Sequence, residues 1–247
     1  MAETPTLLLT RPAEASDRFA AQLHGILGGA MPRVLTAPLI RVDYAGRLPD
    51  MASVAALVFT SANGVRAYVA AGGPRGLPAW AVGEATAEAA RRAGLAPRTA
   101  GGDARALVET LTQEARPAGR LLHVHGEHAR GEVAQKLRAA GLDAEEAVLY
   151  RQLLLPLTDA AAQALDGAAP VVVPLFSPRT AAQFAAQHRG RAPLLLAAMS
   201  AAVAHRVAHL PAARLLQAER PDAPAMLRAV VSLLDHAARL EGPEPGG

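Results

Sequence analysis

The chain has 247 residues, enough for one large domain or two of ordinary size, and 51% of them are hydrophobic. It has no cysteine, which excludes disulfides, thiolate metal sites and a cysteine nucleophile, and its aromatic content of 3% argues against a stacking surface for single-stranded nucleic acid. The net charge is only +3, and the 25 basic side chains include a single lysine, Lys136. The many arginines suit bidentate contact with carboxylates. A GC-rich genome, however, would also enrich both arginine and alanine.

The chain begins with MAETPTLLLT, which has no basic residue and an apolar run of only three leucines, unlike a signal peptide. No later stretch reaches the roughly 18 consecutive apolar residues that a membrane span needs. We therefore expect a cytoplasmic protein with neither a membrane nor a nucleic acid as its partner.

Short apolar runs alternate with helix-like segments along the chain. The predicted strands are Thr6–Thr10, Ala56–Thr60, Ala79–Val82, Arg120–Val124, Val171–Phe176, Leu194–Ala198 and Arg214–Gln217. The predicted helices are Ala13–Leu27, Asn63–Ala71, Glu84–Ala93, Ala104–Glu114, Gly131–Ala140, Thr180–His188, Ala201–His209 and Pro224–Ala238. Uninterrupted apolar runs are typical of strands buried on both faces, so the alternation predicts an α/β fold with parallel sheets flanked by helices.

Part of this pattern occurs twice. When the sequence is aligned with itself at a single shift, Ser61 aligns with Ser177, Tyr68 with Phe184, and Ala81 with Ala197. After a short insertion in the second copy, Asp103 aligns with Asp222. Each copy has the order strand, serine, helix, strand, helix, strand, aspartate, helix. The sequence therefore predicts two similar α/β domains.

Two extended segments, Thr36–Tyr44 and Ala147–Leu157, flank the first copy, and Pro38 is unsuited to a helix interior. If the two segments pair, they form a two-stranded linker, and the N-terminal strand and helix pack with the second copy. The predicted organisation is a discontinuous domain of residues 1–37 and 158–247, a domain of residues 45–147, and a linker of residues 38–44 and 148–157.

Eight short motifs occur in order over nearly the whole chain. They are LLTRP (Leu8–Pro12), APLI (Ala37–Ile40), FTSANGV (Phe59–Val65), VGEATAEAARRAG (Val82–Gly94), RGEVAQKLRAAG (Arg130–Gly141), VLYR (Val148–Arg151), FSPRTAAQF (Phe176–Phe184) and AERPDAPAML (Ala218–Leu227). In this order and spacing they resemble the uroporphyrinogen-III synthase family. The resemblance implies two α/β domains joined by a two-stranded linker.

The resemblance also implies an activity. The family closes hydroxymethylbilane, a linear tetrapyrrole polycarboxylate, into uroporphyrinogen III in haem biosynthesis, with loss of water and inversion of the terminal pyrrole ring. It uses no cofactor and no metal, and we expect a monomer. The demand on such an enzyme is largely positional, because one ring carbon rather than its neighbour must reach the electrophile.

Helix N-termini can bind the carboxylates of such a substrate, because their first-turn N–H groups lack hydrogen-bond partners. In a parallel sheet these N-termini follow the carboxyl ends of the strands, where ligands usually bind. The candidate substrate-binding residues are Arg11, Ser61, Ala62, Asn63, Gly83, Thr86, Ser177, Pro178, Arg179 and Ser200. Ser61 and Ser177 suit helix capping equally well, and Arg11 suits a surface ion pair. Met199 takes the place of Gly83 in the second copy, which weakens the second corner as a binding site.

Tyr150, in the VLYR motif, matches the family tyrosine proposed to help the hydroxyl leave, and we name it as the candidate catalytic residue. A phenol can donate a proton to a leaving oxygen. The alternative is a tyrosine that packs on the linker with its hydroxyl in water.

Two other functions remain open, one based on a cluster of histidines and one on the two-domain layout. His123, His125 and His128 have a spacing that suits zinc, which would indicate a metal-dependent hydrolase, but no second ligand motif follows downstream. A two-domain protein of this kind could also bind a ligand without catalysis. We predict the synthase, with no metal site.

Overall fold

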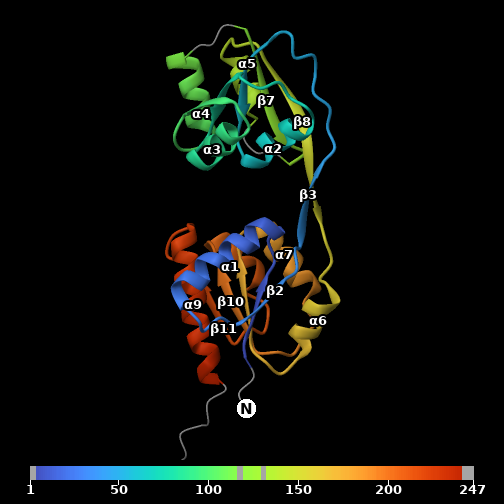
Figure 1. Ribbon diagram of the computed structural model, residues 1–247, viewed down its shortest axis with the longest axis vertical. Helices are drawn as coiled ribbons and strands as arrows, with labels where there is room; N and C mark the ends of the chain where they lie inside the picture. Colours follow the sequence, from blue (N-terminus) through green and yellow to red (C-terminus); the bar gives the residue numbers. More distant parts are fainter. Residues whose placement is uncertain (1–3, 116–118, 129–131, 241–247) are drawn as a thin grey trace, which may run out of the picture. The chain divides into compact units, whose positions relative to one another are not determined.

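The computed structural model describes residues 4–115, 119–128 and 132–240. Gly131, the first residue of the helix predicted at 131–140, and the C-terminal residues 241–247 lie outside this described part. Contacts divide the chain into two compact units: unit 1 contains Met1–Arg41 and Leu154–Gly247, and unit 2 contains Val42–Leu153 (Figure 1). Both breaks fall inside the ranges 38–44 and 148–157, which the sequence marks as extended.

Unit 1 is built around a five-stranded parallel sheet. The strand order is β11 (Arg214–Gln217), β10 (Leu194–Ala198), β9 (Val171–Leu175), β1 (Thr6–Leu9) and β2 (Arg33–Thr36). The three central strands are fully buried because helices cover both faces of the sheet.

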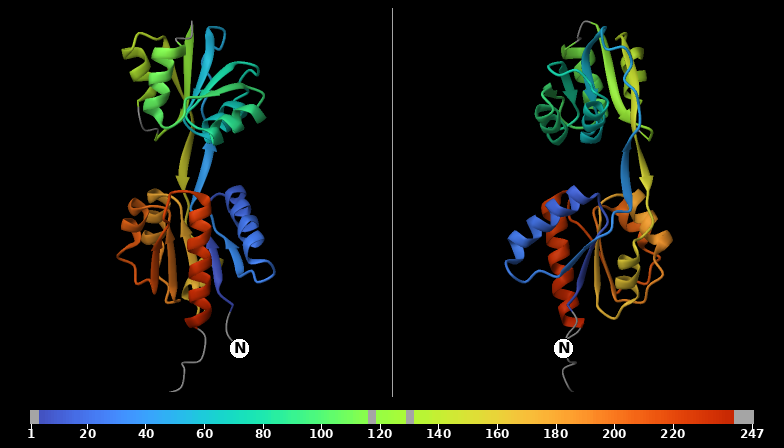
Figure 2. Two further views of the ribbon diagram at one scale, coloured as in Figure 1. Left: turned by 90° about the vertical axis from the view of Figure 1, so that its left-hand side faces the viewer. Right: turned by 45° about the vertical axis from the view of Figure 1, so that its right-hand side comes forward.

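The helices of unit 1 form two layers (Figures 1 and 2). One layer packs α1 (Ala13–Leu27) beside α9 (Ala223–Leu240) over a core that includes Phe19, Leu23 and Val230. The other contains α6 (Asp159–Asp166), α7 (Pro178–Gln187) and α8 (Ala201–Val207), around Phe184 and Leu165.

Unit 2 has a six-stranded sheet in the order β3 (Ile40–Tyr44), β8 (Ala144–Leu154), β7 (Arg120–Gly126), β4 (Val54–Phe59), β5 (Pro78–Ala81) and β6 (Ala96–Thr99). The pairs from β8 to β6 are parallel. One face is covered by α2 (Ala62–Ala70) and α3 (Glu84–Arg92), and the other by α4 (Ala104–Thr110) and α5 (Val133–Ala139).

The repeated pattern in the sequence corresponds to a repeated structure. Unit 2 has the order β4-α2-β5-α3-β6-α4, and unit 1 has β9-α7-β10-α8-β11-α9. In unit 2, β7 lies beside β4 and is followed by α5 and then by β8. In unit 1, β1 lies beside β9 and is followed by α1 and then by β2. The predicted α/β class with parallel sheets flanked by helices is confirmed.

Some elements differ from the prediction. The edge strands β2 and β6 are missed by the sequence pattern because their residues, RVLT and APRT, are exposed or only partly buried and form no apolar run. Helix α6 is also missed; Thr158 caps it by accepting a bond from the Ala161 N–H at 3.3 Å. The helix predicted at Ala104–Glu114 is α-helical only to Thr110 and continues as a π-helical turn, Leu111–Ala115.

Strand β8 (Ala144–Leu154) begins and ends three residues before the extended segment predicted at Ala147–Leu157. It has 11 residues and begins at Ala144, and its residues as far as Tyr150 pair with β7. On the other side β8 lies next to β3, and just beyond it the Leu155 N–H donates to the Leu39 carbonyl at 3.0 Å. Of the described helices, none combines the length and the apolarity that crossing a bilayer requires.

Candidate active site

The corner between β4 and α2 is the first predicted binding corner of unit 2. Ser61 has an extended backbone and caps α2, since its Oγ accepts a bond from the Gly64 N–H at 3.2 Å. Gly64 lies against β7: a Cβ added there would be 2.8 Å from the Val124 carbonyl oxygen. A glycine in the first turn therefore lets the start of α2 approach the neighbouring strand closely.

Tyr150 reaches this corner from β8. Its ring lies over Gly126 of β7, where an added Cβ would be only 2.5 Å from the ring, so a larger residue would block the path. The Tyr150 hydroxyl then lies 3.0 Å from the Ser61 Oγ. The structure thus brings together two predicted site residues that are 89 positions apart in the chain.

The hydroxyls of Ser61 and Tyr150 can be arranged so that the phenol of Tyr150 has a proton to donate. The Ser61 Oγ already accepts from Gly64, and its own hydrogen can be donated to the tyrosine oxygen. The phenolic hydrogen is then available to a third oxygen. The positive end of α2 lies at the same place, and the N–H groups of Ala62 and Asn63 in its first turn lack intrahelical partners.

The second corner of unit 2 lies next to the first, because β5 pairs with β4. Gly83 caps α3 without any side-chain bond, and an added Cβ at this position would meet no atom within 4 Å. Its φ of −148° is extended and would accept any residue, so neither strain nor packing requires the glycine. Thr86, in the first turn of α3, is only 8% exposed.

Unit 1 gathers the other predicted residues at the carboxyl ends of its own strands. Ser177 caps α7: its Oγ accepts from the Thr180 N–H at 3.1 Å and lies 2.8 Å from the Thr180 Oγ1. Pro178 opens the same helix, and Arg179 beside it is half-buried. Ser200 caps α8 with its backbone alone. The capping interpretation thus holds for Ser177 as it does for Ser61.

Arg11 packs against an aromatic ring, as Arg98 does against Trp80. Its guanidinium lies 4.3 Å from the centroid of the Phe176 ring, and its carbonyl accepts a bond from the Ser16 hydroxyl at 3.0 Å. Burial, and then the charge of Arg18, lowers the pKa of Arg11 below its usual value. No carboxylate among the described residues pairs with Arg11, so the surface ion pair offered as an alternative is not formed there.

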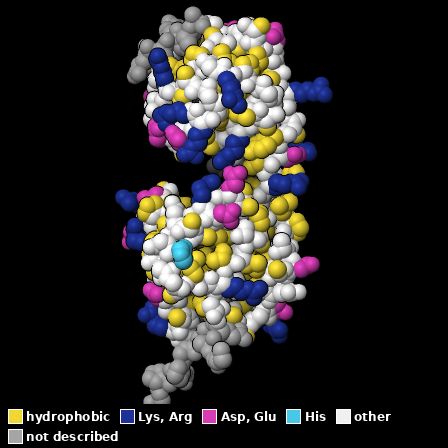
Figure 3. All heavy atoms as spheres, viewed as in Figure 1, with side chains coloured by type: hydrophobic (Ala, Val, Ile, Leu, Met, Phe, Trp, Pro, Cys, Tyr) yellow, Lys and Arg dark blue, Asp and Glu magenta, His cyan; other side chains and the backbone are white. Residues whose placement is uncertain are grey.

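Most other arginine contacts are surface ion pairs. On the face shown in Figure 3, basic and acidic side chains are interspersed in each unit rather than gathered in one patch. The pairs include Arg91 with Glu84 and Glu88, Arg105 with Glu109, Arg120 with Asp143 and Glu145, Arg151 with Asp43, and Arg191 with Asp166. Exposed pairs of this kind contribute little stability each, so arginine content alone does not locate an anion site.

The histidine cluster is arranged differently from the sequence prediction. His123 and His125 stack with ring centroids 4.7 Å apart, but the third member is Glu146 of β8, and His128 is exposed in the turn after β7. Burial, and then His125, lowers the pKa of His123 to about 3, which keeps its ring neutral. The sequence pattern gave no sign of Glu146, because strand pairing alone places it there.

Sequence reasoning also missed two residues that shape the site. Gly126, over which Tyr150 passes, and Phe176, against which Arg11 packs, were not named as site residues. A glycine inside a strand signals a close approach, so Gly126 could have been found. Phe176 offered no comparable signal.

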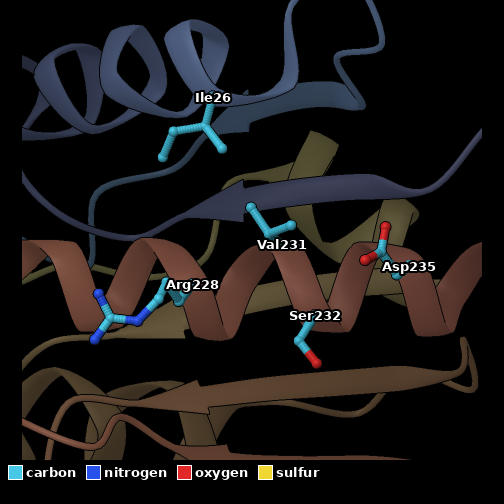
Figure 4. Close-up of a pocket in the computed structure, with 5 residues that line it drawn as sticks. All are labelled: Ile26, Arg228, Val231, Ser232 and Asp235. Carbon is cyan, nitrogen blue, oxygen red and sulfur yellow. The ribbon is translucent and has the colours of Figure 1, made fainter.

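A shallow hollow of unit 1 lies apart from these residues. It is between α1 and α9 and is lined by Ile26, Arg228, Val231, Ser232 and Asp235 (Figure 4). Arg228 is paired with Glu219 at 3.1 Å. The described lining includes none of the predicted substrate-binding residues, so the hollow is not part of the candidate site.

Comparison with known proteins agrees with the motif pattern. A family model described as uroporphyrinogen-III synthase HemD matches residues 23–228. No curated protein matches the sequence significantly.

Two solved structures are similar to the chain. A uroporphyrinogen-III synthetase from Helicobacter pylori 26695 has 18% identity and a TM-score of 0.66, over 93% of this chain and 99% of that one. A mutant uroporphyrinogen III synthase from the extremely thermophilic bacterium Thermus thermophilus has 18% identity and a TM-score of 0.48, over 96% and 100% of the two chains. At this identity the first likeness shows a shared fold, and the second adds no argument.

Proposed function

The chain belongs to the uroporphyrinogen-III synthase family, and we propose that its Tyr150 and its strand-to-helix corners carry out the family reaction. The protein is a cyclising lyase of tetrapyrrole biosynthesis, which closes hydroxymethylbilane to uroporphyrinogen III with loss of water and inversion of the terminal ring. The comparisons favour neither a metal-dependent hydrolase nor a binding protein without activity.

The observation that carries the proposed mechanism is the contact of 3.0 Å between the Tyr150 hydroxyl and the Ser61 Oγ at the start of α2. To form the electrophile, the C–O bond of the hydroxymethyl group breaks, and the leaving oxygen must take up a proton. Tyr150 donates that proton, and water leaves. Ser61 keeps its hydrogen and donates a hydrogen bond to the resulting phenolate, and the positive end of α2 favours the negative charge there.

The proton balance closes without a further reactant. The terminal ring attacks the electrophilic carbon and, once the macrocycle has formed, a ring carbon releases a proton. That proton returns to the Tyr150 oxygen. The net change is the loss of one water molecule, as the family reaction requires.

Substrate binding is proposed at the corners of each unit. In unit 2, the N–H groups of Ala62 and Asn63 in the first turn of α2 donate hydrogen bonds to one carboxylate. The N–H groups at the corner from Gly83 to Thr86 donate to another. The uncapped start of α3 at Gly83, with open space in front of it, supports this assignment.

In unit 1 the proposed carboxylate contacts come from Arg11, Ser177, Pro178, Arg179 and Ser200. Arg11 is the strongest of these, because its half-buried guanidinium has no carboxylate partner among the described residues. Multiple fixed contacts hold the flexible substrate so that one ring carbon, and not its neighbour, approaches the electrophile. We further propose that the protein acts as a cytoplasmic monomer and that the reaction needs no cofactor.

The test is an isomer assay on hydroxymethylbilane with and without the protein, read by liquid chromatography. We expect isomer III as the dominant product, at a rate that EDTA does not change. Isomer I alone, formed at the spontaneous rate, would overturn the assignment of the reaction. A rate that depends on metal would overturn the cofactor-free mechanism while leaving the family membership intact.

A further inference from the structure

A second cluster of chemically competent side chains lies in unit 2 on β7 and β8. His123 and His125 are two residues apart on β7 and therefore point to the same face of the sheet. Glu146 of β8 is paired in register with His123. One ligand atom from each of these three residues lies within 4.8 Å of the others. We call these three residues the histidine–glutamate cluster.

His123 lacks any hydrogen-bond partner among the described residues. It is 2% exposed, and both of its ring nitrogens are buried. A buried polar group without a partner is unfavourable, so such a group calls for an explanation.

The fold itself does not require a histidine at this position. In the alignment of the two copies, Ala56 of β4 corresponds to Val172 of β9. Ala56 pairs with Leu121 of β7, and Val172 pairs with Leu7 of β1, so Leu121 corresponds to Leu7. Two residues further along, His123 of β7 therefore corresponds to Leu9 of β1. Leu9 is 1% exposed, so an apolar side chain fills the same place in unit 1.

His125 is held in the tautomer of a metal ligand. Its Nδ1 lies 2.8 Å from the Gly126 carbonyl oxygen and, in the neutral ring, donates a hydrogen to it. The lone pair is then on Nε2, which is 3.4 Å from the Glu146 Oε2 but has no hydrogen-bond partner. A bond from the second ring nitrogen to a carbonyl is the usual way in which a protein orients a histidine toward a metal.

The geometry points to a divalent metal site: we propose that His123, His125 and Glu146 bind zinc, with a fourth position open to water. Two imidazole nitrogens and one carboxylate oxygen are a normal zinc donor set. Two donors on one tetrahedral zinc lie about 3.4 Å apart, given metal–ligand distances near 2.1 Å. The His125 and Glu146 atoms already have that spacing, whereas the stacked rings of His123 and His125 must turn toward each other to share one ion.

The site is separate from the proposed reaction. By strand alternation, His123 and Glu146 share the face of Leu121 and Ala144, which is covered by α4 and α5. Tyr150 packs on the core of the other face, under α2 and α3. Zinc is therefore expected to stabilise unit 2 by binding its folded state, without taking part in ring closure. The Glu146 side chain is 52% exposed, which gives an ion access from solvent.

The test uses the full chain after removal of metal with EDTA and titrates it with Zn²⁺ alone by calorimetry. We expect one equivalent to bind and the melting temperature to rise. Co²⁺ in place of zinc should give the visible absorption of a tetrahedral complex, a signal that does not depend on enzyme activity.

Three variants make the test specific. His123→Leu, which copies Leu9, should fold and lose zinc binding, and Glu146→Gln should weaken binding about tenfold or more. His128→Ala is the matched control, because His128 is exposed and outside the cluster, and it should bind zinc as the parent does.

Binding that is absent from the parent, or that persists unchanged in both His123→Leu and Glu146→Gln, would overturn the proposal. Loss of binding in His128→Ala would overturn the assignment of Glu146 as the third ligand. If His123→Leu does not fold, the comparison of Glu146→Gln with His128→Ala still decides. The isomer assay with EDTA, run well below the melting temperature of the metal-free protein, tests the proposed function independently of these results.

Discussion

Units 1 and 2 share one order of strands and helices around a parallel sheet, yet they differ at a few corresponding positions. Where β1 of unit 1 has the buried Leu9, β7 of unit 2 has the buried His123. Where α7 has Phe184, α2 has Tyr68, and both rings are at most 1% exposed. The apolar pattern therefore determines the repeated fold, and single polar replacements add chemistry to one copy of it.

The two capping serines show the same difference. Ser61 and Ser177 each accept a bond from an N–H three residues later. The second contact of Ser177 is to its own helix at Thr180, whereas that of Ser61 is to Tyr150, which comes from a distant strand. Identical local motifs thus acquire different roles from what the sheet places beside them. Five predictions test this comparison.

The largest effect is expected from placing a histidine in unit 1. Leu9→His buries an imidazole where the surroundings are apolar, so we expect a loss of about 3 kcal/mol in the free energy of unfolding. Urea unfolding measures it. His123→Leu is the reverse control and should leave the metal-free protein equally or more stable. If Leu9→His were as stable as the parent, unit 1 would tolerate a buried imidazole at this position. The difference between Leu9 and His123 would then have no effect on stability.

Tyr68 should make stability depend on alkaline pH. Burial raises the pKa of Tyr68 from 10.0 to about 12, and its hydroxyl donates to the Pro74 carbonyl at 2.7 Å. The folded state thus favours the neutral phenol. The resulting stability is fully present below pH 10 and is lost as pH rises toward 12, by on the order of 2 kcal/mol.

Tyr68→Phe is the control for that pH dependence and copies Phe184 of unit 1. It should cost about 1 kcal/mol near neutral pH and remove the additional loss between pH 10 and 12, as measured by urea unfolding across this range. The same alkaline loss in parent and variant would assign it to other groups.

Tyr150→Phe should reduce turnover by about ten- to a hundredfold, nearer the low end, since it removes the proton but keeps the ring over Gly126. Isomer III should still form, and the melting temperature should hardly change. Steady-state kinetics and thermal unfolding measure the two quantities. Normal turnover with a lower melting temperature would instead identify Tyr150 as a packing residue.

Arg11→Ala should raise KM about tenfold and change turnover less, because a lost carboxylate contact weakens binding of substrate and transition state alike. Raising the salt concentration should increase KM of the parent through screening, and the variant should respond less. Arg228→Ala, whose arginine lies in the hollow between α1 and α9, is a control expected to leave KM unchanged. An unaltered KM in Arg11→Ala would remove Arg11 from the substrate site.

The smallest effect compares the two capping serines directly. Ser61→Ala and Ser177→Ala each lose one cap, and each should cost about 1 kcal/mol of stability. Only Ser61→Ala should also lower turnover, by a few-fold, because only Ser61 contacts Tyr150. Paired measurements of unfolding and turnover separate the two roles. Equal turnover losses in both variants would show that the contact with Tyr150 has no special part in the reaction.

The sequence by itself determined the repeated α/β plan. Central strands such as Val171–Leu175 are buried on both faces, so they leave an apolar run that can be recognised without any partner. The serine corners were recognisable for a similar reason, since capping is a local interaction within three residues. The exposed edge strands Arg33–Thr36 and Ala96–Thr99 left no such pattern, because pairing with a neighbour, rather than burial of their side chains, makes them strands.

The tertiary structure alone decided which side chains meet. Parallel pairing of β7 with β8 places Glu146 beside His123, and the small Gly126 lets Tyr150 reach Ser61. Neither contact has a spacing that can be recognised along the chain, since register between strands depends on the packing of whole sheet faces. The composition and periodicity of this protein thus specify its layers, whereas strand register specifies its chemistry.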